Sequence, residues 1–292
     1  MNRTQPTVIG VDLGGTNVRA GRVVQAVIDH AAMSLRDTGD SQSVIDDVCA
    51  TIERVLTPEV TAIGIGVPSL VDPDLGIVYN VTNIPSWKEV HLKQILEARF
   101  HLPVHINNDA NCFALGEFHY GLGQGSRHLV GLIIGTGLGA GVIVNSHLFT
   151  GAHHGAGEIG AIPFKGNTLE HVISGPRFLR MYGVDGQTLL GRAEAGDADA
   201  LKAFADFGTD LGVAVKTLLY VYDPDTIILG GSVSKAFTFF EGALREAMAD
   251  FLFPHVLPQV RILPSGDAHM PILGAAALCL DAAVRMSPSP AL

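Results

Sequence analysis

The stretch Ile9-Gly-Val-Asp-Leu-Gly-Gly-Thr-Asn-Val-Arg19 decides how the rest of the chain is organised. Its apolar start, residues 8–11, predicts a strand, and residues 18–24 after the glycines predict a second strand rather than a helix. Two adjacent glycines let backbone N–H groups approach an anion, and a carboxylate beside them indicates a cation between the two. The stretch therefore indicates a metal-nucleotide site, and an ordinary hairpin turn is the alternative that these residues alone leave open.

Composition restricts the class of protein. The chain has 292 residues, of which 47% are hydrophobic and 16% charged, which is ample for a buried core in one large domain or two moderate ones. Its formal net charge is −10 and it has no basic cluster, so nucleic acid is not expected as a partner.

Membrane and disulfide signals are weak. No apolar run reaches the roughly 18 residues that a spanning helix needs, and no secretory signal is expected, so the protein is expected to be cytoplasmic and off the membrane. Its three cysteines, Cys49, Cys112 and Cys279, lie far apart and form neither a disulfide framework nor a zinc set.

Hydrophobic periodicity predicts alternating strands and helices. A third strand of the opening meander is expected at residues 28–36, and further strands at 62–67, 104–106, 129–134, 142–144, 226–229 and 260–263. Helices are expected at residues 41–56, 91–101, 110–118, 199–222, 235–251 and 274–284, the last packing back onto the first half. Ser43 and Asp46 resemble a capping box for the first helix, and residues 68–87 are expected to be mostly loop.

The opening pattern occurs twice. Residues 129–144 again read strand, glycine turn, strand, which suggests two similarly built halves. Because both turns lead into strands, a P-loop and a Rossmann fingerprint are excluded, and two hairpins could hold a phosphate chain from both sides. Gly230 and Gly231, between a strand and a helix, suit an adenosine or phosphate contact, with two tight turns as the alternative.

Five motifs occur in order along the chain: Asp12-Leu-Gly-Gly-Thr-Asn17, Asn108-Asp-Ala-Asn111, Gly135-Thr-Gly-Leu-Gly-Ala-Gly141, Gly157-Glu-Ile-Gly160 and Ile228-Leu-Gly-Gly-Ser232. Together they resemble the ROK family of sugar kinases and repressors, which includes bacterial glucokinases. The resemblance implies an α/β, two-domain actin-like ATPase (ribonuclease H-like) fold with a nucleotide and sugar cleft between the domains. The small domain would comprise residues 1–118 and about 275–292, and the large domain residues 119–274.

The resemblance also gives the polar residues roles. Asp109 corresponds to the catalytic base that takes a proton from the sugar hydroxyl, whereas the sequence alone favours a helix N-cap there. Asp12 corresponds to the aspartate that holds Mg²⁺ through water, and a turn residue is its alternative. The remaining cofactor contacts implied are Gly14, Gly15, Thr16, Asn17, Thr136, Gly137 and Gly139 for the phosphates, with Gly230 and Gly231 on the adenosine side.

The same resemblance implies a sugar site made of Asn83, Asn108, Asp109, Glu158 and Glu170. Without it, Glu158 and Glu170 would be ordinary solvated acids. Trp87 is either a core anchor or a neighbour of the sugar, and His153 and His154 are interpreted as loop residues rather than ligands.

One departure from the family pattern concerns residues 161–170. Many members have a histidine where this chain has Ala161, followed by a zinc-binding cysteine cluster, and this segment contains no cysteine. A zinc site is therefore not expected, contacts at the anomeric end of the sugar are in doubt, and the loop is expected to be held by packing of Ile162 and Phe164.

The implied function is ATP-dependent, Mg²⁺-dependent phosphorylation of a hexose, with glucose at its 6-hydroxyl as the first expectation. Fructose, allose, N-acetylglucosamine and N-acetylmannosamine remain open. A sugar-responsive regulator and an actin-like ATPase without a sugar substrate are the other readings. The regulator is less expected, because only seven residues precede the first strand and family repressors carry an added DNA-binding domain. A homodimer is expected by analogy with the family.

Overall fold

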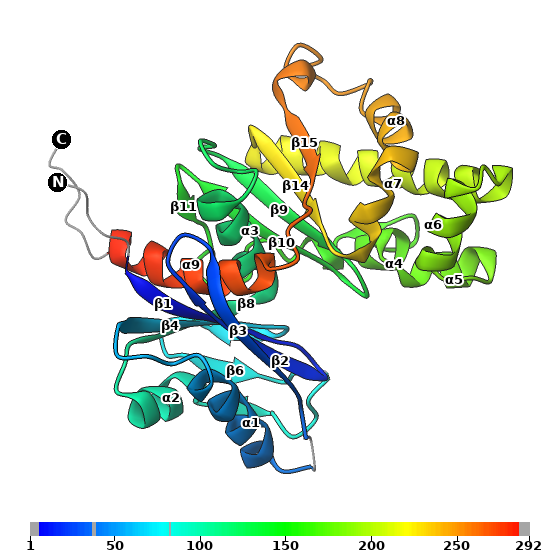
Figure 1. Ribbon diagram of the computed structural model, residues 1–292. Coiled ribbons are helices and arrows are strands. Elements are labelled where there is room, and N and C mark those ends of the chain that lie inside the picture. Colours follow the sequence, from blue (N-terminus) through cyan, green and yellow to red (C-terminus); the bar gives the residue numbers. More distant parts are fainter. Residues whose placement is uncertain (1–5, 37–38, 82, 286–292) are drawn as a thin grey trace, which may run out of the picture. The chain divides into compact units, whose positions relative to one another are not determined.

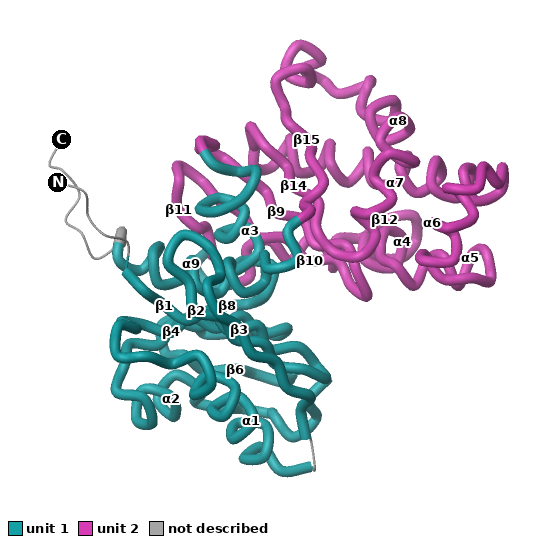
Figure 2. Tube along the Cα trace, viewed as in Figure 1, with its two compact units in different colours: residues 1–124, 151–154, 267–292 teal, residues 125–150, 155–266 magenta. Residues whose placement is uncertain are grey.

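The computed structural model describes residues 6–36, 39–81 and 83–285 (Figure 1). The chain divides into two compact units (Figure 2). Unit 1 comprises residues within 1–124, 151–154 and 267–292, and unit 2 comprises residues 125–150 and 155–266. Among the described helices, none is both long and apolar enough to span a membrane.

Unit 1 is built on a five-stranded sheet in the order β3-β2-β1-β4-β8. The meander of β1 (Thr7–Leu13), β2 (Asn17–Val23) and β3 (Val27–Ser34) is antiparallel, as the opening stretch predicts. β4 (Val60–Val67) is parallel to β1, and β8 (Val104–Asn108) is parallel to β4. The carboxyl ends of β1, β4 and β8 therefore meet at one edge of this sheet.

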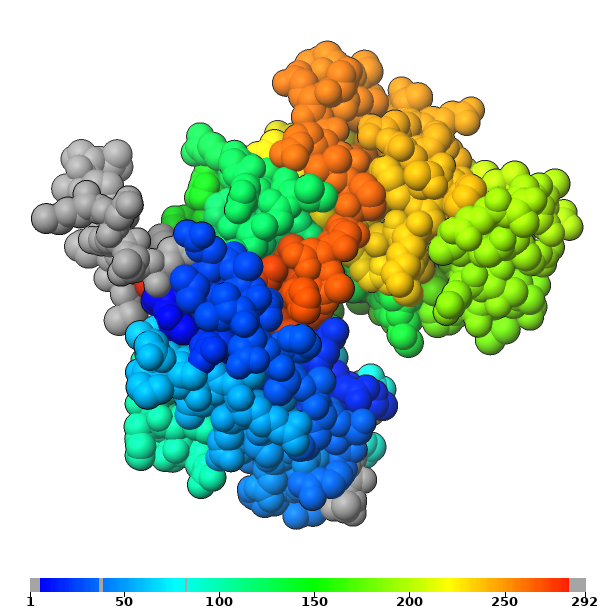
Figure 3. Space-filling model, in the orientation of Figure 1, coloured from blue at the N-terminus to red at the C-terminus, as the bar shows by residue number. Residues whose placement is uncertain are grey.

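Helices cover both faces of the unit 1 sheet. Alternate residues of β1 pack with α1 (Ser41–Glu53) and α2 (Leu92–Phe100) in one apolar core. α9 (Met270–Arg285) lies on the other face, which confirms that the last helix returns to the first half. The exposed residues just before this helix reach the surface next to the N-terminal part of the chain, drawn in blue (Figure 3). A Cβ on Gly10 would lie 2.0 Å from the carbonyl oxygen of Ile272, so this glycine lets the helix rest directly on the sheet.

Unit 2 repeats this strand order as β11-β10-β9-β14-β15. β9 (Leu129–Ile134), β10 (Leu138–Val144) and β11 (His147–Leu148) form an antiparallel meander. β14 (Thr226–Gly230) runs parallel to β9, and β15 (Arg261–Pro264) runs parallel to β14. The predicted internal repeat is thus confirmed by the strand order. α7 (Ala198–Tyr222) and α8 (Phe237–Ala247) share one apolar core with this sheet.

Several local predictions are wrong. Asp40, not the Ser43–Asp46 pair, caps α1: its side chain accepts from the backbone N–H of Gln42, while the Ser43 hydroxyl donates to the Asp40 carbonyl. Residues 68–87, by contrast, are mostly loop as predicted, and they also contain two short strands of a small sheet formed by β5 (Leu70–Asp72), β6 (Ile77–Tyr79) and β7 (Glu89–Val90).

Elements of the second half also differ from expectation. The helix predicted at residues 235–251 is a 3₁₀ turn, η2 (Ser232–Ala236), followed by α8, and a further 3₁₀ turn is η3 (Leu257–Gln259). Before α7 the chain forms short elements that were not predicted: η1 (Ile159–Ala161), β12 (Pro163–Phe164), β13 (Asn167–Thr168), α4 (Leu169–Ile173), α5 (Pro176–Tyr182) and α6 (Gly186–Glu194).

Candidate functional site

The carboxyl edge of the unit 1 sheet gathers the predicted metal and base residues. Asp12 on β1 is level with Gly66 on β4, and Gly66 is level with Asn107 on β8. Adjacent strands lie about 4.8 Å apart, so Asp12 is roughly two strand spacings from Asn107. Asp109 begins α3 (Asp109–Tyr120) directly after β8. The fold thus brings Asp12 and Asp109, far apart in sequence, to the same edge.

Asp12 has a partner that was not predicted from the sequence. Arg19 faces it across the first hairpin, and its Nε and Nη2 both donate to Asp12 Oδ2, at 3.0 and 2.5 Å. Both bonds end on one carboxylate oxygen, so Oδ1 is the oxygen that Arg19 does not use. The register of an antiparallel pair could have revealed this partner, because the two residues are equally distant from the turn.

A cluster of asparagines orients the start of α3. The Asn108 side chain caps the helix by accepting from the Asn111 N–H at 2.9 Å, and Asn107 Oδ1 accepts from Asn111 Nδ2 at 2.9 Å. Asn107 and Asn111 are buried, so these bonds hold the helix start firmly on the strand end. The alternative that Asp109 is the N-cap is wrong, because Asn108 fills that position.

A buried thiol lies close to both aspartates. Burial raises the pKa of Cys112 well above its usual value, and the negative charges of Asp109 and Asp12 raise it further. A Cβ on Gly66 would lie 3.1 Å from the Cys112 sulfur and 3.9 Å from the Asp109 Cα. Cys112 is therefore a buried thiol beside Gly66 of β4 and the start of α3.

The first glycine turn contacts one predicted sugar residue. A Cβ on Gly15 would lie 2.3 Å from the Cβ of Asn83, so the backbone of the turn at Gly15 packs directly against the Asn83 side chain. Trp87, four residues further on, is completely buried and donates from Nε1 to the Ser41 carbonyl at 3.2 Å. The interpretation of Trp87 as a core anchor is therefore confirmed, and it holds the loop that carries Asn83.

The second glycine turn contacts another predicted sugar residue. Glu170 on α4 accepts a hydrogen bond at Oε2 from the Leu138 N–H at 3.0 Å, and a Cβ on Gly137 would lie 2.8 Å from the same oxygen. The Gly175 N–H donates to the Gly135 carbonyl at 2.7 Å. The segment from Glu170 to Gly175 therefore holds the second hairpin at both ends of its turn.

The segment preceding α4 differs from its prediction. Glu158 is exposed just before η1, and Gly160 lies next to Glu170: a Cβ on Gly160 would lie 3.4 Å from the Glu170 Cβ. Of the two apolar residues expected to hold the loop, only Phe164 packs on the core, whereas Ile162 is 36% exposed. An ion pair between Lys165 and Asp210 of α7 supplies the missing anchor.

A pocket of about 520 Å³ opens beside the second hairpin within unit 2. Its walls combine the turn residues Gly135 and Thr136 with apolar side chains of α5, α6 and α7 and with the η2 turn. Gly231 directly precedes this turn with φ of +85°, and a Cβ there would lie 2.3 Å from the Ile134 carbonyl oxygen. Gly230 and Gly231 thus lie against the end of β9 and directly precede Ser232, which lines the pocket.

A second polar group lies in unit 1. Asp72, Asp74 and His154 offer ligand atoms within 4.8 Å of one another. Asp72 Oδ1 already accepts from the backbone N–H groups of Asp74 and Leu75, and the Asp74 side chain is 85% exposed. His154 belongs to this group and His153 does not, so the interpretation of both histidines as loop residues rather than ligands stays a prediction.

Duplicated units, each with a glycine hairpin at the start of its five-stranded sheet, define the actin-like ATPase class of fold. The ROK family model matches residues 8–282, so the chain belongs to the ROK family.

Relatives within this family include kinases and repressors. Glucokinase from Thermotoga maritima is 32% identical, over 93% of this chain and 96% of the relative. The crystal structure of a ROK family glucokinase from Streptomyces griseus with glucose and AMPPNP is 27% identical, with a TM-score of 0.78 over 93% of this chain and 98% of that one. A xylose repressor from Bacillus spizizenii is 28% identical, over 75% of this chain and 61% of the repressor. The glucokinase relatives and the solved kinase structures support a sugar kinase.

Proposed function

We propose that this protein is a cytoplasmic, ATP-dependent hexose kinase. One observation carries the proposal: in each unit the glycine turn packs against a residue of the sugar motifs, Gly15 against Asn83 and Gly137 against Glu170. An ATPase that does not bind a sugar has no reason to pair a phosphate turn with such a residue twice. The similarity to glucokinases supports a sugar as the substrate that these paired residues would bind.

The nucleotide is assigned to the two hairpins and to the pocket of unit 2. Gly14 to Asn17 and Thr136, Gly137 and Gly139 would offer backbone N–H groups and hydroxyls to the phosphates. The pocket of about 520 Å³, with Gly230 and Gly231 directly before its lining residue Ser232, has the size and the mostly apolar lining of a small-molecule site and would take the adenosine.

Magnesium is assigned to Asp12. A carboxylate oxygen is a ligand that Mg²⁺ prefers, and Arg19 occupies only Oδ2, so Oδ1 suits a water of the hydrated ion. When bound, the ion would neutralise charge on the phosphates. Arg19 keeps the Asp12 carboxylate at the mouth of the first hairpin, at a fixed orientation.

Asp109 is assigned as the general base. A sugar hydroxyl is a poor nucleophile at neutral pH, so its proton must move to a base as the oxygen attacks the γ-phosphorus. The Asn107–Asn108–Asn111 cluster fixes the helix start that carries Asp109, which limits the positions that its carboxylate can take.

The sugar is assigned to Asn83, Asn108, Asp109, Glu158 and Glu170. Glucose is the first candidate, because several relatives are named glucokinases, and its 6-hydroxyl is the proposed site of phosphorylation. Amide and carboxylate groups that pair with hydroxyls discriminate strongly between sugars. Ala161, where many members carry histidine, leaves other hexoses and N-acetylhexosamines open.

A coupled assay of ADP release tests the function. Glucose, fructose, mannose, allose and the two N-acetylhexosamines are supplied with ATP, with and without Mg²⁺. The proposal predicts that at least one sugar stimulates ADP release, only when Mg²⁺ is present. ADP release that no sugar changes would identify a non-sugar ATPase, and sugar binding without any ADP release would identify a regulator.

A further inference from the structure

Glu170 reaches the second hairpin from a helix that cannot be stable by itself. α4 has five residues, and an isolated helix needs roughly 12 or more to persist in water. The position of the Glu170 carboxylate against Leu138 and Gly137 therefore depends on whatever holds α4.

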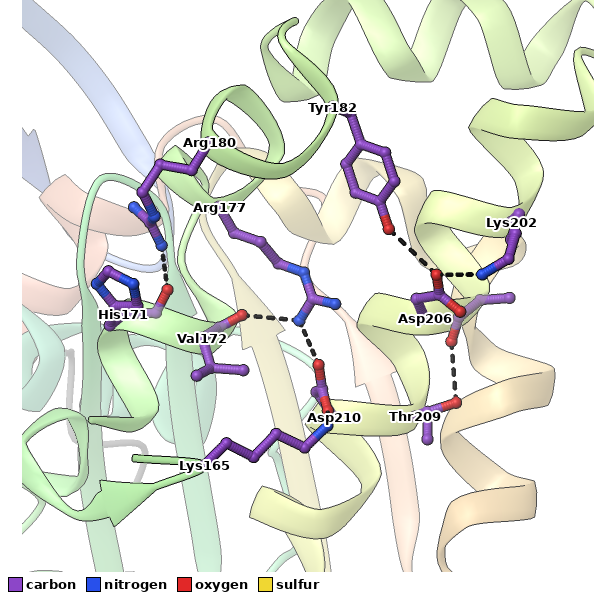
Figure 4. Close-up of polar contacts among 11 residues, drawn as sticks. Lys165, His171, Val172, Arg177, Arg180, Tyr182, Lys202, Asp206, Thr209 and Asp210 are labelled. Carbon is purple, nitrogen blue, oxygen red and sulfur yellow. Dashed lines mark hydrogen bonds and ion pairs between the residues drawn. The ribbon is translucent and has the colours of Figure 1, made fainter. Parts of the chain in front are cut away.

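Both ends of α4 are held by side chains. At its start, the Thr168 hydroxyl accepts from the His171 N–H at 3.2 Å, and Leu169 and Ile173 are buried in the unit 2 core. At its end, two arginines of α5 donate to carbonyls that lack a partner within the helix, as Figure 4 shows. Arg177 Nη1 donates to the Val172 carbonyl at 2.9 Å, and Arg180 donates to the His171 carbonyl.

The two arginines differ in their surroundings. Arg180 is exposed, whereas the Arg177 side chain is only 3% exposed and forms an ion pair with Asp210 of α7, whose side chain is 7% exposed (Figure 4). Lys165, from the turn between β12 and β13, pairs with the other oxygen of the same carboxylate. A guanidinium buried this deeply requires a counter-ion, so Asp210 determines where Arg177 lies.

We propose that Asp210 and Arg177 are positioning residues that keep Glu170 on the second glycine hairpin. Neither residue lines the pocket beside that hairpin. Their influence passes from Asp210 through Arg177 and the Val172 carbonyl to α4, and from Glu170 to the Leu138 N–H. The nucleotide part of this proposal rests on the unit 2 hairpin, and the sugar part rests on the proposed function.

One neighbouring residue serves as a matched control. Asp206 lies one turn before Asp210 on α7 and pairs with Lys202 and Tyr182 (Figure 4). A purely general loss of stability would appear in Asp206→Asn as well as in Asp210→Asn, whereas loss of positioning would not.

A double-mutant cycle on AMPPNP affinity, measured by calorimetry, tests the proposal. Asp210→Asn should weaken AMPPNP binding about tenfold, because the charged hydrogen bond from the Leu138 N–H to Glu170 would no longer be held in place. Asp206→Asn should change it less than twofold. In the Glu170→Ala background, Asp210→Asn should have almost no further effect, because the carboxylate through which it acts is gone.

Removal of one buried charge can unfold the chain, so the double variant R177M/D210L removes both charges and keeps apolar volume. Thermal melting identifies which variants are folded. This double variant should show the same loss of AMPPNP affinity as Asp210→Asn. Equal losses with and without Glu170, or wild-type affinity in a folded double variant, would overturn the proposal. Failure of every sugar to be phosphorylated by the wild type would instead overturn the proposed function, and the AMPPNP cycle would still decide this inference.

Discussion

The two glycine hairpins share a backbone plan but not their stabilising contacts. Leu13 pairs with Val18 at the closed end of the first, and Ile134 pairs with Leu138 at the closed end of the second. One position before each pair, the first hairpin has Asp12 opposite Arg19, and the second has Ile133 opposite Gly139. The two units therefore share their strand order, but only the first hairpin has an ion pair at these matching positions.

Because of this difference, the first hairpin suits a cation and the second suits an anion. The first hairpin carries its own ion pair and offers a carboxylate, which suits a hydrated metal ion. The second has no charge at the matching positions and is held from outside by Glu170 and Gly175, so its turn offers backbone N–H groups to an anion. The comparison predicts that changes in the two hairpins will have different signatures.

The largest expected effect lies outside both hairpins. If the hairpins bind the nucleotide and Asp109 is the general base, Asp109→Asn should lower kcat about 10³-fold, which is within the usual range for loss of a general base. Sugar affinity, measured by calorimetry, should change little. Asp199→Asn, an exposed aspartate on α7, is the matched control. Full turnover in Asp109→Asn would show that Asp109 is not the general base.

In the first hairpin, Asp12→Asn should lower kcat/KM about 30-fold, since supporting groups around a metal commonly contribute 10- to 100-fold. The Mg²⁺ concentration needed for half-maximal turnover should rise. Asp29→Asn, which removes another aspartate that pairs with an arginine of the same meander, should leave that concentration unchanged. An unaltered Mg²⁺ requirement in Asp12→Asn would assign the metal elsewhere.

Matched alanine substitutions in the two turns should differ in kind. Gly15→Ala would place Cβ against the Asn83 Cβ, close to the loop backbone, so it should lower stability by about 1–3 kcal/mol and weaken sugar binding. Gly137→Ala meets only the end of the flexible Glu170 side chain, so it should weaken AMPPNP binding a few-fold at nearly unchanged stability. Gly191→Ala, in open space on α6, is the control. Identical outcomes for the two turns would contradict the comparison.

The smallest expected effect on activity lies just before β9, at the end of that strand remote from the glycine turn. Burial raises the pKa of Asp225, but bonds from the His128 and Arg127 N–H groups and from the Thr226 hydroxyl outweigh burial and lower it overall. Because the folded pKa lies below the unfolded value of about 4, this stabilisation is present above pH 4 and is lost as pH falls further. Asp225→Asn should lower stability by about 1–2 kcal/mol at pH 7 and lose less stability on acidification. Parallel acid unfolding curves would contradict this.

The fold was largely predictable from the sequence because its strong signals are local. The apolar runs of β1 and β9, their glycine turns and the periodicity of α7 determine strand, turn and helix without tertiary information. The duplicated pattern then indicated the architecture, and the motif order indicated the family.

The contacts that hold the candidate site were not predictable because they are long-range or lack a period. Arg19 lies opposite Asp12 only in one register of the hairpin. Asp210 lies 40 residues after Glu170 on α7, whose apolar periodicity predicts a helix but not the residues that the helix contacts. α4 is too short to produce a pattern, and its arginine caps come from the next helix. Ile162 was expected to hold the loop that Lys165 actually anchors, because hydrophobicity alone cannot reveal an ion pair.

The most direct test of the kinase assignment is ³¹P NMR of wild-type protein with Mg-ATP and each hexose in turn. We expect the signal of a sugar 6-phosphate monoester to grow with one sugar and the signal of the ADP β-phosphate to grow with it, and we expect Asp109→Asn to show neither signal. Inorganic phosphate that accumulates at the same rate with and without every sugar would contradict it.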